Sequence, residues 1–187
     1  MHKYLLSLLF LILLSCGSNN QTFHGSDITQ ARLQPNFELL DQDEQIFTQE
    51  MLTNKISAIF FGFANCPDIC PTTMSALKQV SSQVKDSNFQ VIFISVDPER
   101  DSFSFLKNFI AQFGSNVIGL TGSKIAVKNT ADAFKVFFEK VEQGDSYTID
   151  HSAGIYLVDK KGILRIREPY GQDISSIAED VLNLLRE

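Results

Sequence analysis

Two continuous apolar runs limit what this chain can fold into. Residues 56–63 read ISAIFFGF and residues 89–96 read FQVIFISV. Runs of this kind are typical of strands that are covered on both faces, as the parallel strands of an α/β sheet are. Between them, an apolar stripe at helical spacing extends from Met74 to Val84. The sequence therefore predicts a strand–helix–strand unit at the centre of the fold.

The rest of the chain continues the alternation of strands and helices. We expect a hairpin over 37–47, a helix over 103–113, a strand over 117–120, a helix from Ser123 to about Phe138, a hairpin over 154–167 and a last helix from Asp173 or Ser175. Together these elements predict an α/β domain with a central mixed sheet flanked by helices and a small N-terminal hairpin. Neither a repeat nor a second linker interrupts residues 33–187, so we expect this range to be one domain.

Composition narrows the class of protein. The 187 residues are 44% hydrophobic and 20% charged, which is ordinary for a globular protein and argues against disorder of the whole chain. The formal net charge of -6 argues against a nucleic-acid partner, which would require a basic face.

The first 32 residues predict export and a lipid anchor. Residues 1–15 carry Lys3 and then an apolar run, the layout of a secretory signal peptide. The sequence LLSC ending at Cys16 resembles a bacterial lipobox, whose cysteine is lipidated after cleavage; an uncleaved signal anchor is the alternative. Residues 16–32 would then be a lipidated, polar tether in which His24 is solvated. We expect an extracytoplasmic lipoprotein on the periplasmic face of a bacterial membrane, with inner or outer membrane left open.

Cys66 and Cys70, in CPDIC, are then the two remaining thiols, and they face an oxidising compartment. We expect the first at the carboxyl end of a strand and the second near a helix amino terminus, whose partial positive charge lowers a thiol pKa. Cysteines four residues apart on a helical turn lie close enough for a disulfide or for binding one soft ion. A purely structural disulfide would close a very short loop and stabilise weakly. A redox pair is the stronger alternative, although three residues separate these cysteines rather than the two of C-x-x-C.

A third ligand is expected at His151, in YTIDHSAG. Two thiolates alone hold Cu(I), but Cu(II) calls for a harder ligand such as imidazole. His2 leaves with the signal peptide and His24 lies in the tether, so His151 is the remaining candidate. A lone loop histidine is more often a surface group, but Tyr147 and Asp150 beside it favour a site. We expect the polar loop over 142–150 to be mobile and to carry the imidazole in and out.

Three segments, FFGFANCPDICP, ISVDPERD and YTIDHSAGIYLVDKKG, resemble the Sco/SenC family of copper proteins over residues 33–187. The resemblance implies a thioredoxin-like fold, one copper ion per chain, and Cys66, Cys70 and His151 as its ligands. Asp97 matches an acidic position of the family, although Asp-Pro is also an ordinary turn opener. Asp150 is a candidate to orient the His151 ring, although neighbours in sequence often point apart.

The resemblance implies a role in assembling the binuclear copper centre of cytochrome c oxidase. The expected function is a membrane-tethered copper chaperone whose partner is the copper-bearing oxidase subunit, with other periplasmic copper chaperones or thiol oxidoreductases as further partners. The alternative is a thiol–disulfide oxidoreductase that uses Cys66 and Cys70 as its catalytic redox pair, so whether the protein is an enzyme stays open. Many family members carry a transmembrane helix, whereas this chain is expected to use a lipid.

Overall fold

The structure is a computed structural model that describes residues 22–33 and 35–187. The predicted signal peptide and Cys16 therefore lie outside the described residues. The elements are β1 (Ser26–Asp27), η1 (Thr29–Ala31), β2 (Glu38–Asp41), β3 (Ile46–Thr48), η2 (Gln49–Leu52), β4 (Ile56–Gly62), α1 (Ile69–Val84), β5 (Phe89–Ser95), α2 (Phe103–Ile110), β6 (Val117–Thr121), α3 (Lys124–Ala133), β7 (Phe138–Gln143), β8 (Ser146–His151), β9 (Ile155–Val158), β10 (Leu164–Glu168) and α4 (Ile174–Arg186). No helix in this described part is long and apolar enough to cross a membrane.

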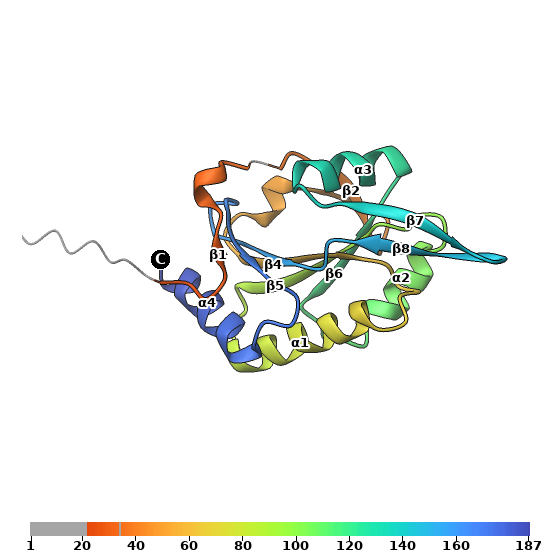
Figure 1. Ribbon diagram of the computed structural model, residues 1–187. Coiled ribbons are helices and arrows are strands. Elements are labelled where there is room, and N and C mark those ends of the chain that lie inside the picture. Colours follow the sequence, from red (N-terminus) through yellow and green to blue (C-terminus); the bar gives the residue numbers. More distant parts are fainter. Residues whose placement is uncertain (1–21, 34) are drawn as a thin grey trace, which may run out of the picture.

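The centre of the fold is an eight-stranded mixed sheet in the order β1-β10-β9-β4-β5-β6-β2-β3 (Figure 1). Strands β4, β5 and β6 are parallel, and every residue of β4 and β5 is buried. The hairpins β2–β3 and β9–β10 add antiparallel strands on the two sides. The α/β class, the mixed sheet and the small N-terminal hairpin are thus confirmed.

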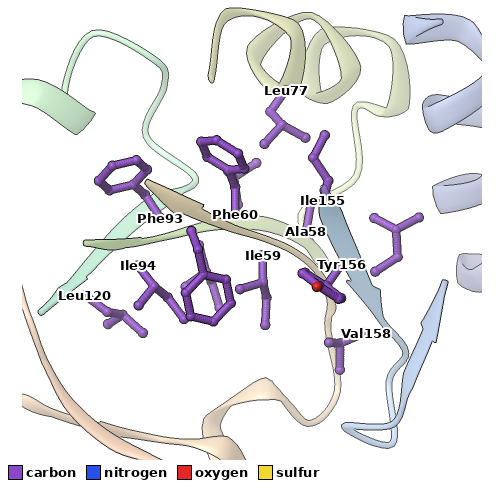
Figure 2. Packing of buried hydrophobic residues seen from close by; sticks show 14 of the residues in the cluster. Ala58, Ile59, Phe60, Leu77, Phe93, Ile94, Leu120, Ile155, Tyr156 and Val158 are labelled. Atoms are coloured by element: carbon purple, nitrogen blue, oxygen red, sulfur yellow. The ribbon is translucent and has the colours of Figure 1, made fainter. Parts of the chain in front are cut away.

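The core has two halves because side chains of β4 and β5 alternate across the sheet. Phe60 and Phe93 point toward Leu77 of α1, with their ring centroids 6.2 Å apart (Figure 2). On the other face the Phe61 ring packs against Phe134, with centroids 5.2 Å apart. Both faces of the sheet are therefore covered, as the unbroken apolar runs predict.

Helices α1, α2 and α4 lie on one face of the sheet and α3 lies over the other (Figure 1). The predicted start of α3 is confirmed, because the Ser123 hydroxyl accepts a hydrogen bond from the Ala126 N–H at 3.1 Å. Its predicted end was wrong: α3 stops at Ala133, and Phe138 already begins β7. Lys135 has a φ of 58°, a left-handed conformation that ends the helix.

The second sheet, formed by β7 and β8 alone, was not predicted from the sequence. These two strands form a hairpin that projects beyond the main sheet (Figure 1), and it turns at Gly144, whose φ is 60°. The prediction of a loop over 142–150 is therefore wrong for most of its length, since Ser146–His151 is a strand. β7 is largely exposed and has no apolar alternation, which removes the pattern by which a strand is recognised.

The N-terminal segment also differs from the expected tether. β1 pairs with β10, and the Ile28 N–H donates to the Arg165 carbonyl oxygen at 2.8 Å. The His24 N–H donates to the Asp180 carboxylate, and the His24 Nε2 lies 3.0 Å from Glu179. Residues 24–31, which we expected in the tether, therefore contact the domain, and His24 is not a free linker residue.

Two buried acids meet under this N-terminal segment. The side chains of Glu168 and Asp180 are both fully buried. Burial, and then the neighbouring Asp180 carboxylate, raise the pKa of Glu168 to about 8. Above its ordinary pKa of 4.5, Glu168 thus holds a proton in the folded protein that the unfolded chain has lost. Its stabilising contribution is complete at low pH and is lost as pH rises toward 8.

We expect Glu168→Gln to remove this pH dependence, because glutamine is neutral at every pH and similar in shape. The free energy of unfolding of the wild type should fall relative to the variant by up to about 1.4 kcal/mol per pH unit between pH 5 and 8. Urea unfolding at pH 5, 7 and 9 measures this difference. Glu179→Gln, which changes an exposed neighbour, is the control. Parallel pH curves for wild type and Glu168→Gln would contradict the prediction.

Candidate metal centre

Three side chains from two distant parts of the sequence meet at one edge of the sheet. Cys66 lies in the loop after β4, Cys70 is the second residue of α1, and His151 is the last residue of β8. The Cys70 Sγ and the His151 Nε2 are 3.6 Å apart across 81 residues of sequence. The two sulfurs and one ring nitrogen all lie within 4.8 Å of one another. These atoms are close enough together to bind one metal ion.

The two thiols are free but unequal in exposure. Cys66 is half-buried, whereas Cys70 is buried, and the Cys70 backbone N–H donates to the Cys66 Sγ at 3.4 Å. Burial raises the pKa of the Cys70 thiol, so the expected lowering by the helix amino terminus was wrong. Burying the charged thiolate in an apolar environment costs more free energy than the helix dipole of α1 offsets. Cys70 therefore stays a neutral thiol at neutral pH until a partner replaces its proton.

The His151 ring is held with one nitrogen facing the thiols. Its Nδ1 lies 3.1 Å from the Ser152 carbonyl oxygen, and because a carbonyl only accepts, Nδ1 carries the proton. The Nε2 lone pair is then directed at Cys70. The rings of Phe60 and Phe63 contact the imidazole edge-on, with centroids 6.0 and 5.9 Å away. Burial lowers the pKa of His151, which keeps the ring neutral, the form that binds metals.

Asp150 does not orient the ring as expected. It is exposed and lies opposite Glu139 on β7, while the Ser152 carbonyl is the ring's hydrogen-bond partner. The reason is the alternation of side chains along β8, which puts Asp150 and His151 on opposite faces.

Asp97 is buried and lies outside the three-atom cluster. Its carboxylate accepts a hydrogen bond from the Tyr147 hydroxyl at 2.9 Å and forms an ion pair with Arg100. Arg100 and its neighbour Asp101 were not identified from the sequence as part of the site. A signal was present, since charged residues directly follow a fully buried strand, where α/β sheets place their sites.

A cavity of about 330 Å³ is lined by Cys66 and His151, whereas Cys70 is buried and does not line it. Phe63, Cys66 and Pro67 line one wall, and Thr148 and His151 line the opposite one. The centre therefore lies between the loop that follows β4 and the β7–β8 hairpin, and it is reachable from outside.

Comparison with known proteins agrees with this geometry. A family model described as SCO1/SenC matches residues 25–186. The chain belongs to the SCO1/SenC family. A SCO2-like protein of Rickettsia prowazekii (strain Madrid E) is 38% identical over 155 residues, which cover 80% of this chain and 74% of that protein.

Solved structures of the family share the fold. The crystal structure of Arabidopsis thaliana ScoI with copper bound superposes with a TM-score of 0.78 at 32% identity, over 82% of this chain and 98% of that one. BsSco, a member of the Sco family of cytochrome c oxidase assembly proteins in which a disulfide switch was identified, gives a TM-score of 0.66 at 25% identity over 80% of this chain and 91% of that one. The thioredoxin-like fold implied by the resemblance is thereby confirmed.

The donor set fits a soft ion of low coordination number. Two sulfurs and a neutral imidazole match the preferences of copper, whereas hard ions such as Mg²⁺ and Ca²⁺ require oxygen ligands. A structural zinc site would need four ligands, and the cluster found in residues 22–33 and 35–187 has three.

Gly62, the last residue of β4, keeps space for the buried thiol. A Cβ at this position would lie 2.8 Å from the Cys70 Sγ and 3.0 Å from atoms of Phe60 and Phe93. We expect Gly62→Ala to displace the sulfur, to lower the unfolding free energy by about 1–3 kcal/mol and to weaken metal binding. Urea unfolding and metal titration measure the two effects. Gly122→Ala, whose Cβ would meet the flexible end of Leu39 at 3.2 Å, is the control; equal effects of the two variants would contradict the prediction.

Proposed function

We propose that this protein binds one copper ion through Cys66, Cys70 and His151 and delivers it to the copper-bearing subunit of cytochrome c oxidase. The observation that carries the proposal is the convergence of two sulfurs and one imidazole nitrogen within 4.8 Å, at a cavity open to the outside. The copper bound by the Arabidopsis relative and the description of BsSco as one of the cytochrome c oxidase assembly proteins support it.

The geometry suits transfer as well as binding. The thiols lie on the main domain, whereas His151 lies at the end of a separate two-stranded hairpin. Withdrawal of the hairpin would leave the ion on two sulfurs, an arrangement that Cu(I) tolerates and Cu(II) does not. The half-buried Cys66 offers the approach for an incoming ligand. Ligands of the partner can therefore replace those of this protein one at a time.

A second function, thiol–disulfide oxidoreduction, is favoured by the unequal exposure of the two thiols. The half-buried Cys66 would attack a partner's disulfide, and the buried Cys70 would then release the partner by attacking Cys66. In balance, the Cys66 and Cys70 thiols are oxidised to one disulfide, and the partner's disulfide is reduced to two thiols. This chemistry needs no imidazole ligand, so His151 distinguishes the two functions.

We expect the reduced protein to bind one Cu(II) per chain with a thiolate-to-copper absorption band. His151→Ala should weaken Cu(II) binding by more than about 100-fold. Losing a residue that merely hydrogen-bonds to a metal ligand already lowers metal affinity by about 10–100-fold, and this variant loses the ligand itself. Cu(I) binding by the two thiols should persist. Titration followed by absorption and electron paramagnetic resonance measures both, and His24→Ala is the matched histidine control.

The same variants separate the two functions. His151→Ala should retain exchange with oxidised glutathione but lose restoration of the oxidase copper centre. Equal restoration by wild type and His151→Ala would contradict copper delivery. Absence of stoichiometric copper binding in either oxidation state would leave the redox function as the better account.

We also propose that the protein is anchored outside the cytoplasm, to a bacterial membrane, through a lipid on Cys16. The support is the sequence LLSC after an apolar run, which resembles a lipobox. Residues 23–31 contact the domain, so the proposed tether comprises at most residues 16–22.

We expect Cys16→Ser to release the protein from the membrane fraction and to remove the mass of the lipid from the mature chain. Fractionation of cells and mass spectrometry of the purified protein measure this. Cys66→Ser is the control, because it removes a cysteine outside the lipobox and should leave the anchor intact. Retention of Cys16→Ser in the membrane would favour an uncleaved signal anchor instead.

A further inference from the structure

We infer that Tyr147 is a positioning residue that holds the β7–β8 hairpin, and with it the His151 ligand, against the domain. The inference rests on the proposed copper function for its purpose, but the contacts that carry it do not involve a metal. It assigns a role to the polar network around Asp97 and Arg100, which the ligand set leaves unexplained.

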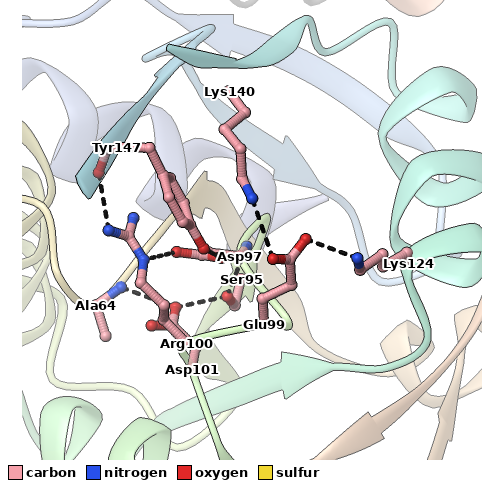
Figure 3. A network of polar contacts seen from close by, with 9 residues as sticks. All are labelled: Ala64, Ser95, Asp97, Glu99, Arg100, Asp101, Lys124, Lys140 and Tyr147. Atoms are coloured by element: carbon pink, nitrogen blue, oxygen red, sulfur yellow. Dashed lines mark hydrogen bonds and ion pairs between the residues drawn. The ribbon is translucent and has the colours of Figure 1, made fainter. Parts of the chain in front are cut away.

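Tyr147 is held on three sides. Its hydroxyl donates to the Asp97 carboxylate at 2.9 Å, and its carbonyl oxygen accepts from the Arg100 guanidinium at 2.8 Å. The same guanidinium lies over the Tyr147 ring, 3.7 Å from its centroid. The Lys140 ammonium lies 3.8 Å from that centroid and also pairs with Glu99 (Figure 3). Asp97, Glu99 and Arg100 belong to the segment that follows β5, so these contacts join the hairpin to the main domain.

The hairpin has few other attachments. It forms a sheet of its own, without ladder hydrogen bonds to the eight-stranded sheet. Within β7 and β8, Ile149 is the only buried side chain. A cavity of about 250 Å³, lined among others by Val96, Phe138 and Ile149, lies beneath the strands. Phe138 and Tyr147 add partly buried contacts with the core. The apolar attachment is therefore limited, and the polar contacts of Tyr147 add to it.

The register of β8 links Tyr147 to the ligand. Side chains two residues apart on a strand point to the same face, so Tyr147, Ile149 and His151 all face the domain. Holding Tyr147 against Asp97 therefore also holds the His151 imidazole on the side of β8 that faces the domain. Lifting Tyr147 off the domain would withdraw His151 from the thiols.

The network continues from the hairpin to the thiol loop. The Ser95 hydroxyl accepts from the Asp97 N–H at 3.1 Å and donates to the Asp101 carboxylate at 2.6 Å. That carboxylate also accepts from the Ala64 N–H at 2.8 Å, two residues before Cys66 (Figure 3). One chain of hydrogen bonds thus connects the hairpin to the loop that carries the half-buried Cys66 thiol.

The contacts are suited to opening as well as closing. Asp97 is 2% exposed and its partner Arg100 is partly exposed, so both charges regain water when the hairpin lifts. Asp97 and Arg100 pair with each other on the domain side, so this ion pair stays intact when the hairpin lifts. Water replaces the Tyr147 hydroxyl and carbonyl oxygen that the two charges lose, so these hydrogen bonds hold the hairpin only modestly. A ligand held in this way is detachable, which copper transfer requires.

Tyr147→Phe tests the inference, because it keeps the ring and its stacking on Arg100 but removes the hydroxyl that Asp97 binds. In the metal-free reduced protein, we expect amide hydrogen exchange over residues 138–151 to become about tenfold faster, the effect of losing a hydrogen bond to a charged group. Exchange in β9 should be unchanged. In the Cu(II)-loaded protein, release to excess EDTA should speed up by a similar factor, while the absorption spectrum at saturation stays the same.

Two controls separate positioning from general stability. Tyr170→Phe makes the same chemical change at a half-exposed tyrosine and should alter neither rate. Val181→Ala opens a cavity in α4, away from the hairpin, and should lower the global stability without selective exchange in residues 138–151. Tyr147→Leu, which also removes the ring, should exceed Tyr147→Phe in both measurements.

Failure of the positioning role and failure of the proposed copper function give different experimental results. Unchanged hairpin exchange in Tyr147→Phe, or faster exchange spread evenly over the domain, would overturn the positioning role. If the wild type binds no copper, the proposed function fails, but the exchange measurement still decides whether Tyr147 holds the hairpin.

Discussion

The antiparallel pairing of β4 with β9 is the constraint on which the centre depends. In this ladder Phe60 lies opposite Ile155, so the carboxyl end of β4 lies beside the start of β9. The thiols follow β4 and the imidazole precedes β9, and the pairing therefore brings them to the same edge of the sheet. A slip of one residue would reverse every side chain of β9, whose four residues are all buried. The apolar core thus fixes the register, and the register fixes the distance between Cys70 and His151.

Burial shifts the pKa values of the two kinds of ligand in opposite directions. Both shifts keep the ligands neutral in the metal-free protein. Burial raises the pKa of Cys70 and lowers the pKa of His151, so each group is neutral before an ion arrives. A neutral thiol resists unwanted oxidation, because the thiolate is the reactive form. A neutral imidazole already presents its lone pair toward the sulfur. Only a partner that binds sulfur strongly can replace the thiol proton.

The ligands are divided between a rigid sheet and a loosely held hairpin. This division allows one ligand to leave while the others keep their positions. α1 holds Cys70 within the packed core and β4 leads into the loop that carries Cys66, whereas β7 and β8 bury one side chain between them. Polar contacts at Tyr147 restrain the hairpin, and polar contacts in water contribute modestly to stability. For the proposed copper delivery this difference is useful, since the strongly packed part keeps the site's shape and the weakly held part lets a ligand leave.

The sequence by itself determined the central strands, the helix after the cysteines and the three candidate ligands. Local apolar patterns decide whether a segment is a covered strand or a helix, and the residue types Cys66, Cys70 and His151 carry their chemistry with them. The resemblance to the Sco/SenC family implies the same three residues. Much of the fold, and the identity of the candidate site, could therefore be predicted without coordinates.

Only the tertiary structure decided how those residues are surrounded. It replaced Asp150 by the Ser152 carbonyl as the ring's partner, reversed the expected shift in the Cys70 pKa, and formed the β7–β8 sheet where a loop was expected. It also placed His24 and β1 on the domain rather than in a tether. Each of these depends on groups far apart in the sequence. Burial and cross-strand pairing are set by which segments meet in space, and a local pattern of residues does not contain that information.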